Sequence, residues 1–215
     1  MLKVDSLFKS FGALLATDNL SFQVKKRDIH AIIGPNGAGK TTLIGQLTGE
    51  IESDSGSILF DGNNISGVPV HLRSAHGLAR SFQISNIFHD MTTWDNVALA
   101  VQAHAGHSFH FWKNASQEQE LRRPAIEFLA MVGLENRAKF VAGQLSHGEH
   151  RQLEIAMALA TNPKMLLLDE PMAGMGPKES QEIVKILQKL KRKLTILLIE
   201  HDMNVVFTLA DRITV

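Results

Sequence analysis

The stretch Gly34-Pro35-Asn36-Gly37-Ala38-Gly39-Lys40-Thr41 follows the pattern G-x-x-x-x-G-K-[ST] of a phosphate-binding loop. The apolar run 29–33 precedes it, and residues 42–47 can continue as a helix. Between a strand and a helix, the loop can close its backbone N–H groups around phosphate oxygens, and the helix N-terminus adds partial positive charge. We expect Lys40 to reach the β- and γ-phosphates of a nucleotide, and the Thr41 hydroxyl to bind Mg²⁺. A glycine-rich turn without a ligand is the alternative, and the two flanks disfavour it.

Composition limits the class of protein. The 215 residues suffice for one sizeable domain or for a core with an inserted lobe. The 22 basic and 22 acidic residues cancel, so net charge does not favour nucleic acid or an anionic membrane as partner. The absence of cysteine excludes a disulfide framework and a cysteine-based zinc site. The sequence has no signal-peptide core and no apolar run of about 20 residues, so we expect a soluble, cytoplasmic chain.

Two kinds of strand pattern occur. Residues 20–24 alternate between apolar and polar side chains, and 57–60 look like a second strand that ends in a turn, as in an antiparallel sheet. Residues 165–168 and 194–199 are apolar without alternation, which is typical of parallel strands buried on both faces. The segment 179–193 between them has helical spacing and a basic C-terminal end. This strand–helix–strand order predicts an α/β sheet with the phosphate loop at the carboxyl end of one strand.

The middle of the chain carries a different pattern. From about residue 84 to residue 160 helical spacing dominates, as in 117–132 and 149–160. We therefore predict a helical subdomain at 84–160, inserted into a nucleotide-binding α/β core made of 1–83 and 161–215.

Two carboxylates end the apolar run before Pro171. A carboxylate at a strand tip beside a phosphate loop can hold Mg²⁺, usually through water, and we assign this Walker B role to Asp169. Glu170 is placed to orient and polarise an attacking water. A solvated acidic turn would be the better interpretation if the glycine loop were not present.

The segment Leu145-Ser146-His147-Gly148-Glu149 precedes a helical run. Ser146 and Glu149 have the spacing of a capping box, so an ordinary helix start is one interpretation. The other is that this helix N-terminus offers a hydroxyl, backbone N–H groups and a dipole to a second phosphate. The segment resembles the signature motif of the ATPase subunits of ABC transporters, commonly L-S-G-G-Q. Ser146 and Gly148 match it, and His147 and Glu149 depart from it.

The resemblance extends over essentially the whole chain. Gln83 lies where the family has its Q-loop glutamine, whose amide would ligate Mg²⁺ or contact the attacking water. His201 lies at the position of the switch histidine, which would hydrogen-bond the γ-phosphate and help to position Glu170. Phe11 matches the aromatic position that stacks on adenine, with plain core packing as the alternative.

The resemblance implies an α/β fold of the P-loop NTPase class, in which a RecA-like core carries an antiparallel β subdomain and an inserted α-helical subdomain. It implies an ATPase that uses ATP and Mg²⁺. Glu170, His201 and Gln83 would be catalytic, and Thr41, Gln83 and Asp169 would hold the metal. The nucleotide would be bound by Phe11, Gly34, Pro35, Asn36, Gly37, Ala38, Gly39, Lys40, Thr41, Thr42, Ser146 and Gly148.

Within the family, the chain resembles the branched-chain amino acid importer ATPases and their urea and amide importer relatives. The likeness rests on residues 61–69, 77–83, 104–120 and 173–175. It implies a head-to-tail dimer with an identical or different cassette, in which Ser146 and Gly148 complete the partner's site. It also implies permease subunits docked near Gln83 and residues 84–89, and an indirect role with a periplasmic or extracellular substrate-binding protein. It implies no nucleic acid, and a place at the inner face of the cell membrane.

Some features depart from this pattern. Gly176 stands where the family carries a carboxylate that helps to link the two active sites, and family members continue beyond Val215, so we expect weakened coupling and a shortened chain. His104, His107 and His110 recur at every third residue, but this spacing spreads them around a helix. We therefore favour a solvated insert over a metal site.

Other functions stay open as alternatives. A soluble cassette ATPase of DNA repair or translation normally carries long coiled-coil inserts or two fused cassettes, and neither fits in this length. A GTPase would need an Asn-Lys-x-Asp element, which the sequence lacks. An importer ATPase for urea or amides differs only in cargo, which does not contact this subunit.

Overall fold

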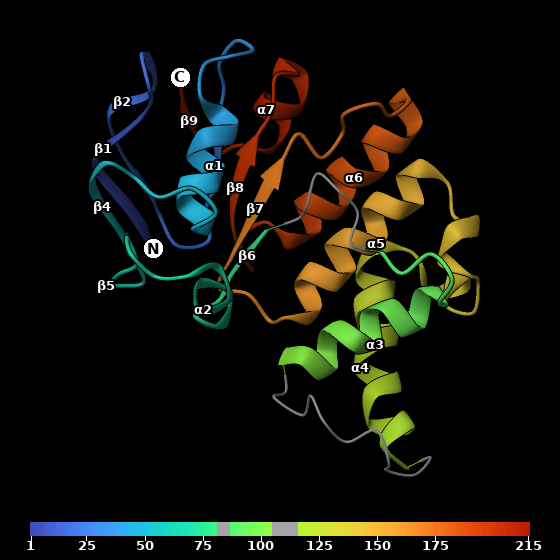
Figure 1. Cartoon of the computed structure of the whole chain (residues 1–215). Coiled ribbons are helices and arrows are strands. Elements are labelled where there is room, and N and C mark those ends of the chain that lie inside the picture. Colours follow the sequence, from blue (N-terminus) through green and yellow to red (C-terminus); the bar gives the residue numbers. More distant parts are fainter. Residues whose placement is uncertain (81–86, 105–115) are drawn as a thin grey trace. The chain divides into compact units, whose positions relative to one another are not determined.

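The computed structural model describes residues 1–80, 87–104 and 116–215, and the chain folds as two compact units (Figure 1). The first unit comprises residues 1–80, 164–170 and 187–215, and the second comprises 81–163 and 171–186. The segment 171–186 thus belongs to the second unit, whereas the sequence placed all of 161–215 in the core. Gln83, His107 and His110 lie outside the described residues.

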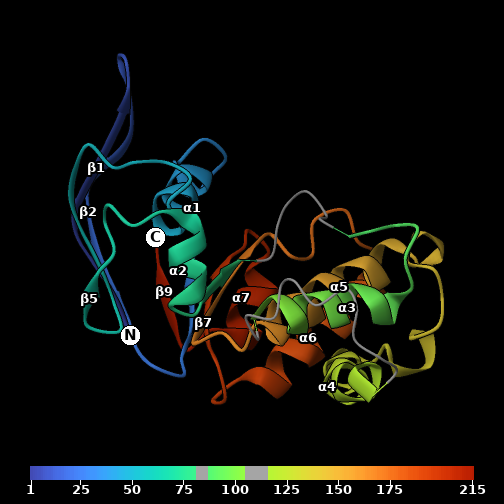
Figure 2. The same ribbon diagram turned by 60° about the horizontal axis from the view of Figure 1, so that its bottom comes forward.

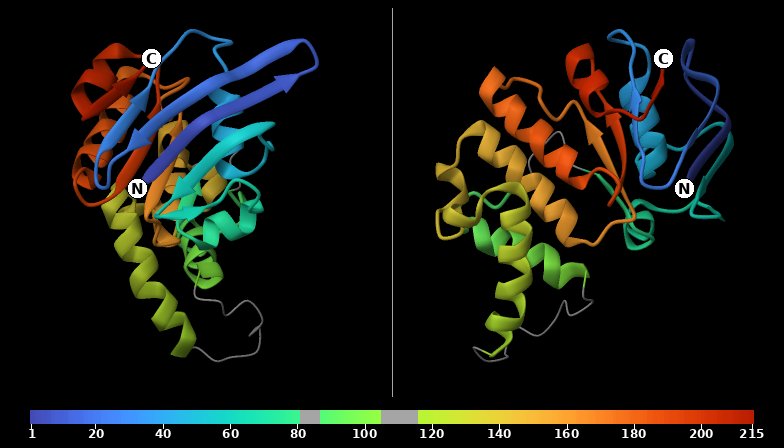
Figure 3. Two further views of the ribbon diagram at one scale, coloured as in Figure 1. Left: turned by 90° about the vertical axis from the view of Figure 1, so that its left-hand side faces the viewer. Right: turned by 180° about the vertical axis from the view of Figure 1, so that it is seen from behind.

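The first unit holds two sheets. A four-stranded antiparallel sheet has the order β2-β1-β4-β5, and a five-stranded parallel sheet has the order β6-β7-β8-β3-β9. The long β1–β2 hairpin is seen in the left view of Figure 3. The strands are β1 (Leu2–Phe11), β2 (Leu14–Val24), β3 (Ile29–Ile32), β4 (Ser55–Phe60), β5 (Asn63–Asn64), β6 (Leu78–Arg80), β7 (Met165–Asp169), β8 (Thr195–Ile199) and β9 (Arg212–Thr214).

The burial of these strands follows from their sequences. Every residue of β3, β7 and β8 is buried, which confirms that the runs without alternation are central parallel strands. In β2, the apolar residues of 20–24 are buried or half-buried and the polar residues between them are exposed, which confirms an antiparallel strand with one solvated face. The α/β fold class predicted from the sequence is therefore correct.

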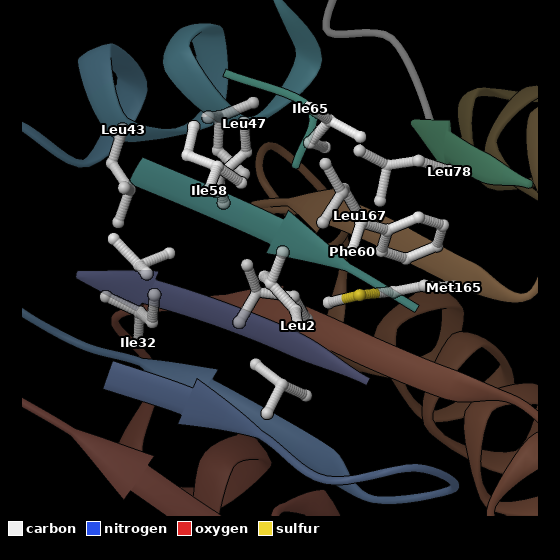
Figure 4. Packing of buried hydrophobic residues seen from close by; sticks show 14 of the residues in the cluster. Leu2, Ile32, Leu43, Leu47, Ile58, Phe60, Ile65, Leu78, Met165 and Leu167 are labelled. Carbon is white, nitrogen blue, oxygen red and sulfur yellow. The ribbon is translucent and has the colours of Figure 1, made fainter. Parts of the chain in front are cut away.

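A common core joins the two sheets of the first unit. Leu2 and Phe60 of the antiparallel sheet pack in the same cluster as Leu167 of the parallel sheet and Leu47 of helix α1 (Figure 4). All four side chains are at most 1% exposed. Since α1 follows the phosphate loop directly, this packing fixes where the loop lies.

The helices of the first unit are short. They are α1 (Lys40–Thr48), α2 (Val70–Ala75) and α7 (Met203–Leu209). Helix α6 (Pro177–Leu190) is divided between the units: residues up to 186 belong to the second unit, and its last four residues belong to the first. It stops three residues before the predicted end at Lys193, because Arg192 adopts a left-handed conformation with φ 68°.

The second unit is helical. Helices α3 (Thr93–His104), α4 (Ser116–Val132) and α5 (His147–Ala160) pack against one another, with short 3-10 turns at Glu135–Arg137 and Ala142–Gln144 (Figure 2). The fully buried amide of Asn96 fixes the start of α3. It accepts from the Phe88 N–H at 2.8 Å and donates to the carbonyls of Phe88 and Thr92. In the part of the chain that the structure describes, no helix combines the length and the apolar character needed to span a bilayer.

Candidate nucleotide site

The glycine loop connects β3 to α1, and glycine is required at two of its positions. Gly37 and Gly39 have φ angles of 83° and 85°, in the left-handed region that side chains disfavour. A Cβ atom on Gly39 would lie 2.1 Å from the carbonyl oxygen of Ala16 in β2, so no larger residue fits. Gly39 is also the N-cap of α1, and no side chain caps that helix start. The first-turn amides of α1 therefore face the loop without a side-chain acceptor.

Lys40 places a positive charge over the loop. Its ammonium donates to the carbonyl oxygens of Gly34 at 2.8 Å and Pro35 at 2.9 Å. Together with the N-terminus of α1, this charge makes the loop attractive to an anion such as a phosphate.

A cavity of about 430 Å³ opens beside the loop, within the range of small-ligand sites. It brings together the β1–β2 hairpin, the glycine loop and the end of β7, all within the first unit. Thr41 and Asp169 contribute a hydroxyl and a carboxylate to this cavity, and such hard oxygen donors are what Mg²⁺ prefers. The donor set therefore fits the metal. The lining residues are Phe11, Leu14, Leu15, Ala16, Asn36, Gly37, Gly39, Lys40, Thr41, Thr42, Asp169 and Glu170.

Phe11 is 49% exposed at this cavity, so it is not a core residue. The ammonium of Lys9 lies 5.4 Å from the centre of its ring. The face of an exposed aromatic ring can stack on a planar base.

Asp169 is buried at the tip of β7, with 5% of its surface exposed. Burial raises its pKa above the ordinary value, and Glu170 adds to this, while Arg80 and Lys40 oppose it. Arg80 approaches the Asp169 carboxylate at 3.5 Å and forms a 2.7 Å ion pair with Glu50. No sequence pattern pointed to Arg80 as a site residue, because neither of its partners is near it in the chain.

Glu170 follows β7 in an unusual backbone conformation. Its φ is 46°, in the left-handed region, and its N–H donates to the carbonyl oxygen of Ile199 at 2.9 Å. One carboxylate oxygen lies 3.6 Å from Nδ1 of His201, which follows the neighbouring strand β8. Strained residues of this kind are often found at functional sites. The structure thus places Glu170 and His201 side by side.

The Ser146 segment lies in the second unit. The capping box is present: Ser146 Oγ accepts from the Glu149 N–H at 3.2 Å, and the Glu149 carboxylate accepts from the Ser146 N–H at 2.9 Å. Burial alone would raise the pKa of Glu149, but the Ser146 hydrogen bond and the ion pair with Arg137 outweigh it and lower the pKa. Gly148 is buried, and its N–H faces Glu179 Oε1 at 3.4 Å.

Gln83, the predicted Q-loop glutamine, lies outside the described residues. The described residues also hold no cluster of three or more histidine, cysteine or acidic side chains with metal-binding geometry. The first unit holds Phe11, the loop residues 34–42, Asp169, Glu170 and His201 of the predicted site.

A glycine loop between a parallel strand and a helix, with acidic residues at the tip of another strand of that sheet, defines a P-loop nucleotide-binding fold. The sequence pattern of the ABC transporter family matches residues 17–173. The chain therefore belongs to the ABC transporter family.

Similar proteins are known over its whole length. The high-affinity branched-chain amino acid transport ATP-binding protein BraF of Pseudomonas aeruginosa is 38% identical over 222 residues, covering 100% of this chain and 87% of the relative. LivG of Escherichia coli K12, of the same description, is 38% identical over 223 residues with the same coverage.

Solved structures agree with this. The ADP conformation of MJ1267, an ATP-binding cassette of an ABC transporter, has a TM-score of 0.86 at 33% identity and covers 99% of this chain and 85% of that one. A dimeric structure of MJ0796, a bacterial ABC transporter cassette, has a TM-score of 0.82 at 26% identity and covers 99% and 93%.

Proposed function

We propose that this chain is the ATP-binding and ATP-hydrolysing subunit of an ABC importer for branched-chain amino acids. The observation that carries the proposal is the cavity in which Lys40, Thr41, Asp169 and Glu170 meet. The full-length similarity to BraF and LivG supports the cargo.

The phosphates of ATP would be held at the start of α1. The Lys40 ammonium, now shared between two loop carbonyls, would turn to phosphate oxygens, which are stronger acceptors because they are charged. The amides of the first turn of α1 would donate to the same phosphates. Thr41 and Asp169 would hold Mg²⁺, which neutralises charge on the phosphates when it is bound. Phe11 would stack on the adenine.

Hydrolysis would use the carboxylate beyond β7. Glu170 would accept the proton of the water that attacks the γ-phosphate, giving ADP and inorganic phosphate. His201, 3.6 Å from the Glu170 carboxylate, would hold that carboxylate in place and hydrogen-bond the γ-phosphate. Gln83 would contact the metal or the water, as the family pattern implies.

The site would be completed by a second cassette. Ser146 and Gly148 stand at the start of α5, a helix whose N-terminus favours an anion. In a head-to-tail dimer, these two residues would bind the γ-phosphate held by the partner. Similarity to a cassette solved as a dimer supports this arrangement. Permease subunits and a substrate-binding protein would complete the transporter at the inner face of the cell membrane.

The test of this function is Glu170→Gln, which keeps the shape of the side chain and removes the base. We expect the variant to bind ATP, to hydrolyse it about 10²- to 10⁴-fold more slowly, and to accumulate as a dimer with ATP. Glu52→Gln, at an exposed carboxylate, is the matched control and should keep full turnover. Wild-type turnover in Glu170→Gln would show that Glu170 is not the base.

The cargo needs a separate experiment. Purified chain reconstituted with permease and binding-protein partners should show ATPase activity that rises with isoleucine, leucine or valine. A rise with urea or an amide instead would assign the other importer group. Copurification with nucleic acid rather than membrane subunits would contradict a transporter.

A further inference from the structure

The backbone amide of Gly148 is covered by a carboxylate of its own chain. Gly148 is buried at the second position of α5, and its N–H faces Oε1 of Glu179 at 3.4 Å. The other oxygen of that carboxylate accepts from the Gly176 N–H at 3.3 Å. Glu179 thus lies at the N-termini of α5 and α6 together, within the second unit.

The packing distances between Gly148 and Glu179 show the same contact. A Cβ atom on Gly148 would lie 3.0 Å from Oε1 of Glu179 and 3.1 Å from both Cδ and Cγ. The end of the Glu179 side chain therefore packs closely against Gly148. A side chain at position 148 would have to push the end of Glu179 aside by a few tenths of an ångström, and Glu179 in turn shields the amide from outside groups.

Ser146 is in the opposite situation. It is exposed, and its Oγ accepts one hydrogen bond from Glu149, so its hydroxyl proton is left to donate. The two residues expected to bind one phosphate therefore differ, because one is open and the other is occupied by an anionic oxygen. A phosphate oxygen is the same kind of acceptor as a carboxylate oxygen, and two negative groups cannot share one N–H without repulsion.

We propose that Glu179 is an internal competitor of the γ-phosphate at the Ser146–Gly148 segment. It holds the Gly148 amide in the free cassette and leaves it when the nucleotide of a partner cassette binds. This inference rests on the proposed function, since it needs a second cassette to bring the phosphate.

The experiment measures ATP-dependent association in the Glu170→Gln background, where hydrolysis is blocked. Glu179→Gln keeps the packing on Gly148 and removes the charge, and Glu179→Ala removes both. Glu182→Gln is the control, an exposed glutamate on the same helix that is paired with Lys185. Sedimentation velocity over a range of ATP concentrations gives the ATP needed for half-maximal dimer.

Removal of the competing negative charge should lower this ATP concentration about threefold to tenfold in both Glu179 variants, and the control should not change it. If Glu179 had only a structural role, its replacement would disorder the segment. The ATP concentration needed for half-maximal dimer would then rise. An unchanged or raised ATP requirement in Glu179→Gln overturns the proposal.

A second measurement does not depend on dimers. In the isolated chain without nucleotide, hydrogen exchange at the Gly148 amide should be faster in Glu179→Ala than in Glu182→Gln, and equal rates would contradict the contact. If the Glu170→Gln parent itself fails to associate with ATP, the proposed function fails, and the exchange rates still decide whether Glu179 covers Gly148.

Discussion

Replacement of Gly39 by alanine tests how β2 shapes the phosphate loop. Two costs follow from the structure. The left-handed φ of 85° costs an alanine about 1–2 kcal/mol. The new Cβ would also lie 2.1 Å from the Ala16 carbonyl oxygen, about 1 Å closer than side chains tolerate, and relief of such overpacking typically costs a further 1–3 kcal/mol. We expect a total destabilisation of about 2–5 kcal/mol.

Gly37→Ala is the matched control. Gly37 has nearly the same φ, 83°, but nothing lies within 4 Å of its Cβ position, so only the conformational cost of about 1–2 kcal/mol applies. Urea unfolding of both variants gives the two free energies, and binding of a fluorescent ATP analogue reports the loop. Gly39→Ala should lose more stability and more affinity than Gly37→Ala. Equal losses in the two variants would refute the clash with Ala16.

Two further predictions concern stability. Asn96→Ala should cost about 1–3 kcal/mol in urea unfolding, because it leaves the Phe88 N–H without its acceptor and removes the amide that donates to the Phe88 and Thr92 carbonyls. Leu99→Ala, at an exposed position of the same helix, should cost clearly less, and equal losses would contradict the structure. Hydrogen bonds from the Lys9 and Ser10 side chains and the Ser10 backbone lower the pKa of Asp54 from 3.8 to about 2. Since the folded-state pKa is depressed, this contribution is present above pH 3.8 and is lost as the pH falls towards 2. An NMR titration of Asp54 with an ordinary midpoint would show that these bonds do not form in solution.

The sequence predicted the elements whose pattern is local. The glycine loop, the fully buried strands β7 and β8, and the helix α5 follow from spacing and side-chain type alone. The acidic pair after β7 was recognisable because it directly follows one of these strands. The meeting of Glu170 and His201 was implied by the family resemblance, and the fold explains it, because both residues follow parallel strands that are neighbours in the sheet.

The site features that could not be predicted from the sequence depend mainly on contacts between residues far apart in the chain. Arg80 lies 30 positions from Glu50 and 89 from Asp169, and no periodic pattern connects them. Glu179 looked like an ordinary acidic residue at the start of a helix, and only the folded chain brings it onto Gly148, 31 positions away. The left-handed backbone of Glu170 is equally invisible, since glutamate does not favour it.

The approach of Ala16 to Gly39 has a consequence for how this chain can diverge. The atom that excludes a side chain at position 39 is a backbone oxygen, and every amino acid at position 16 carries the same oxygen. No substitution in β2 can therefore compensate for a change at Gly39. Position 39 therefore needs glycine whichever residue stands at position 16, and the two positions should show no covariation among related sequences even though they lie close together.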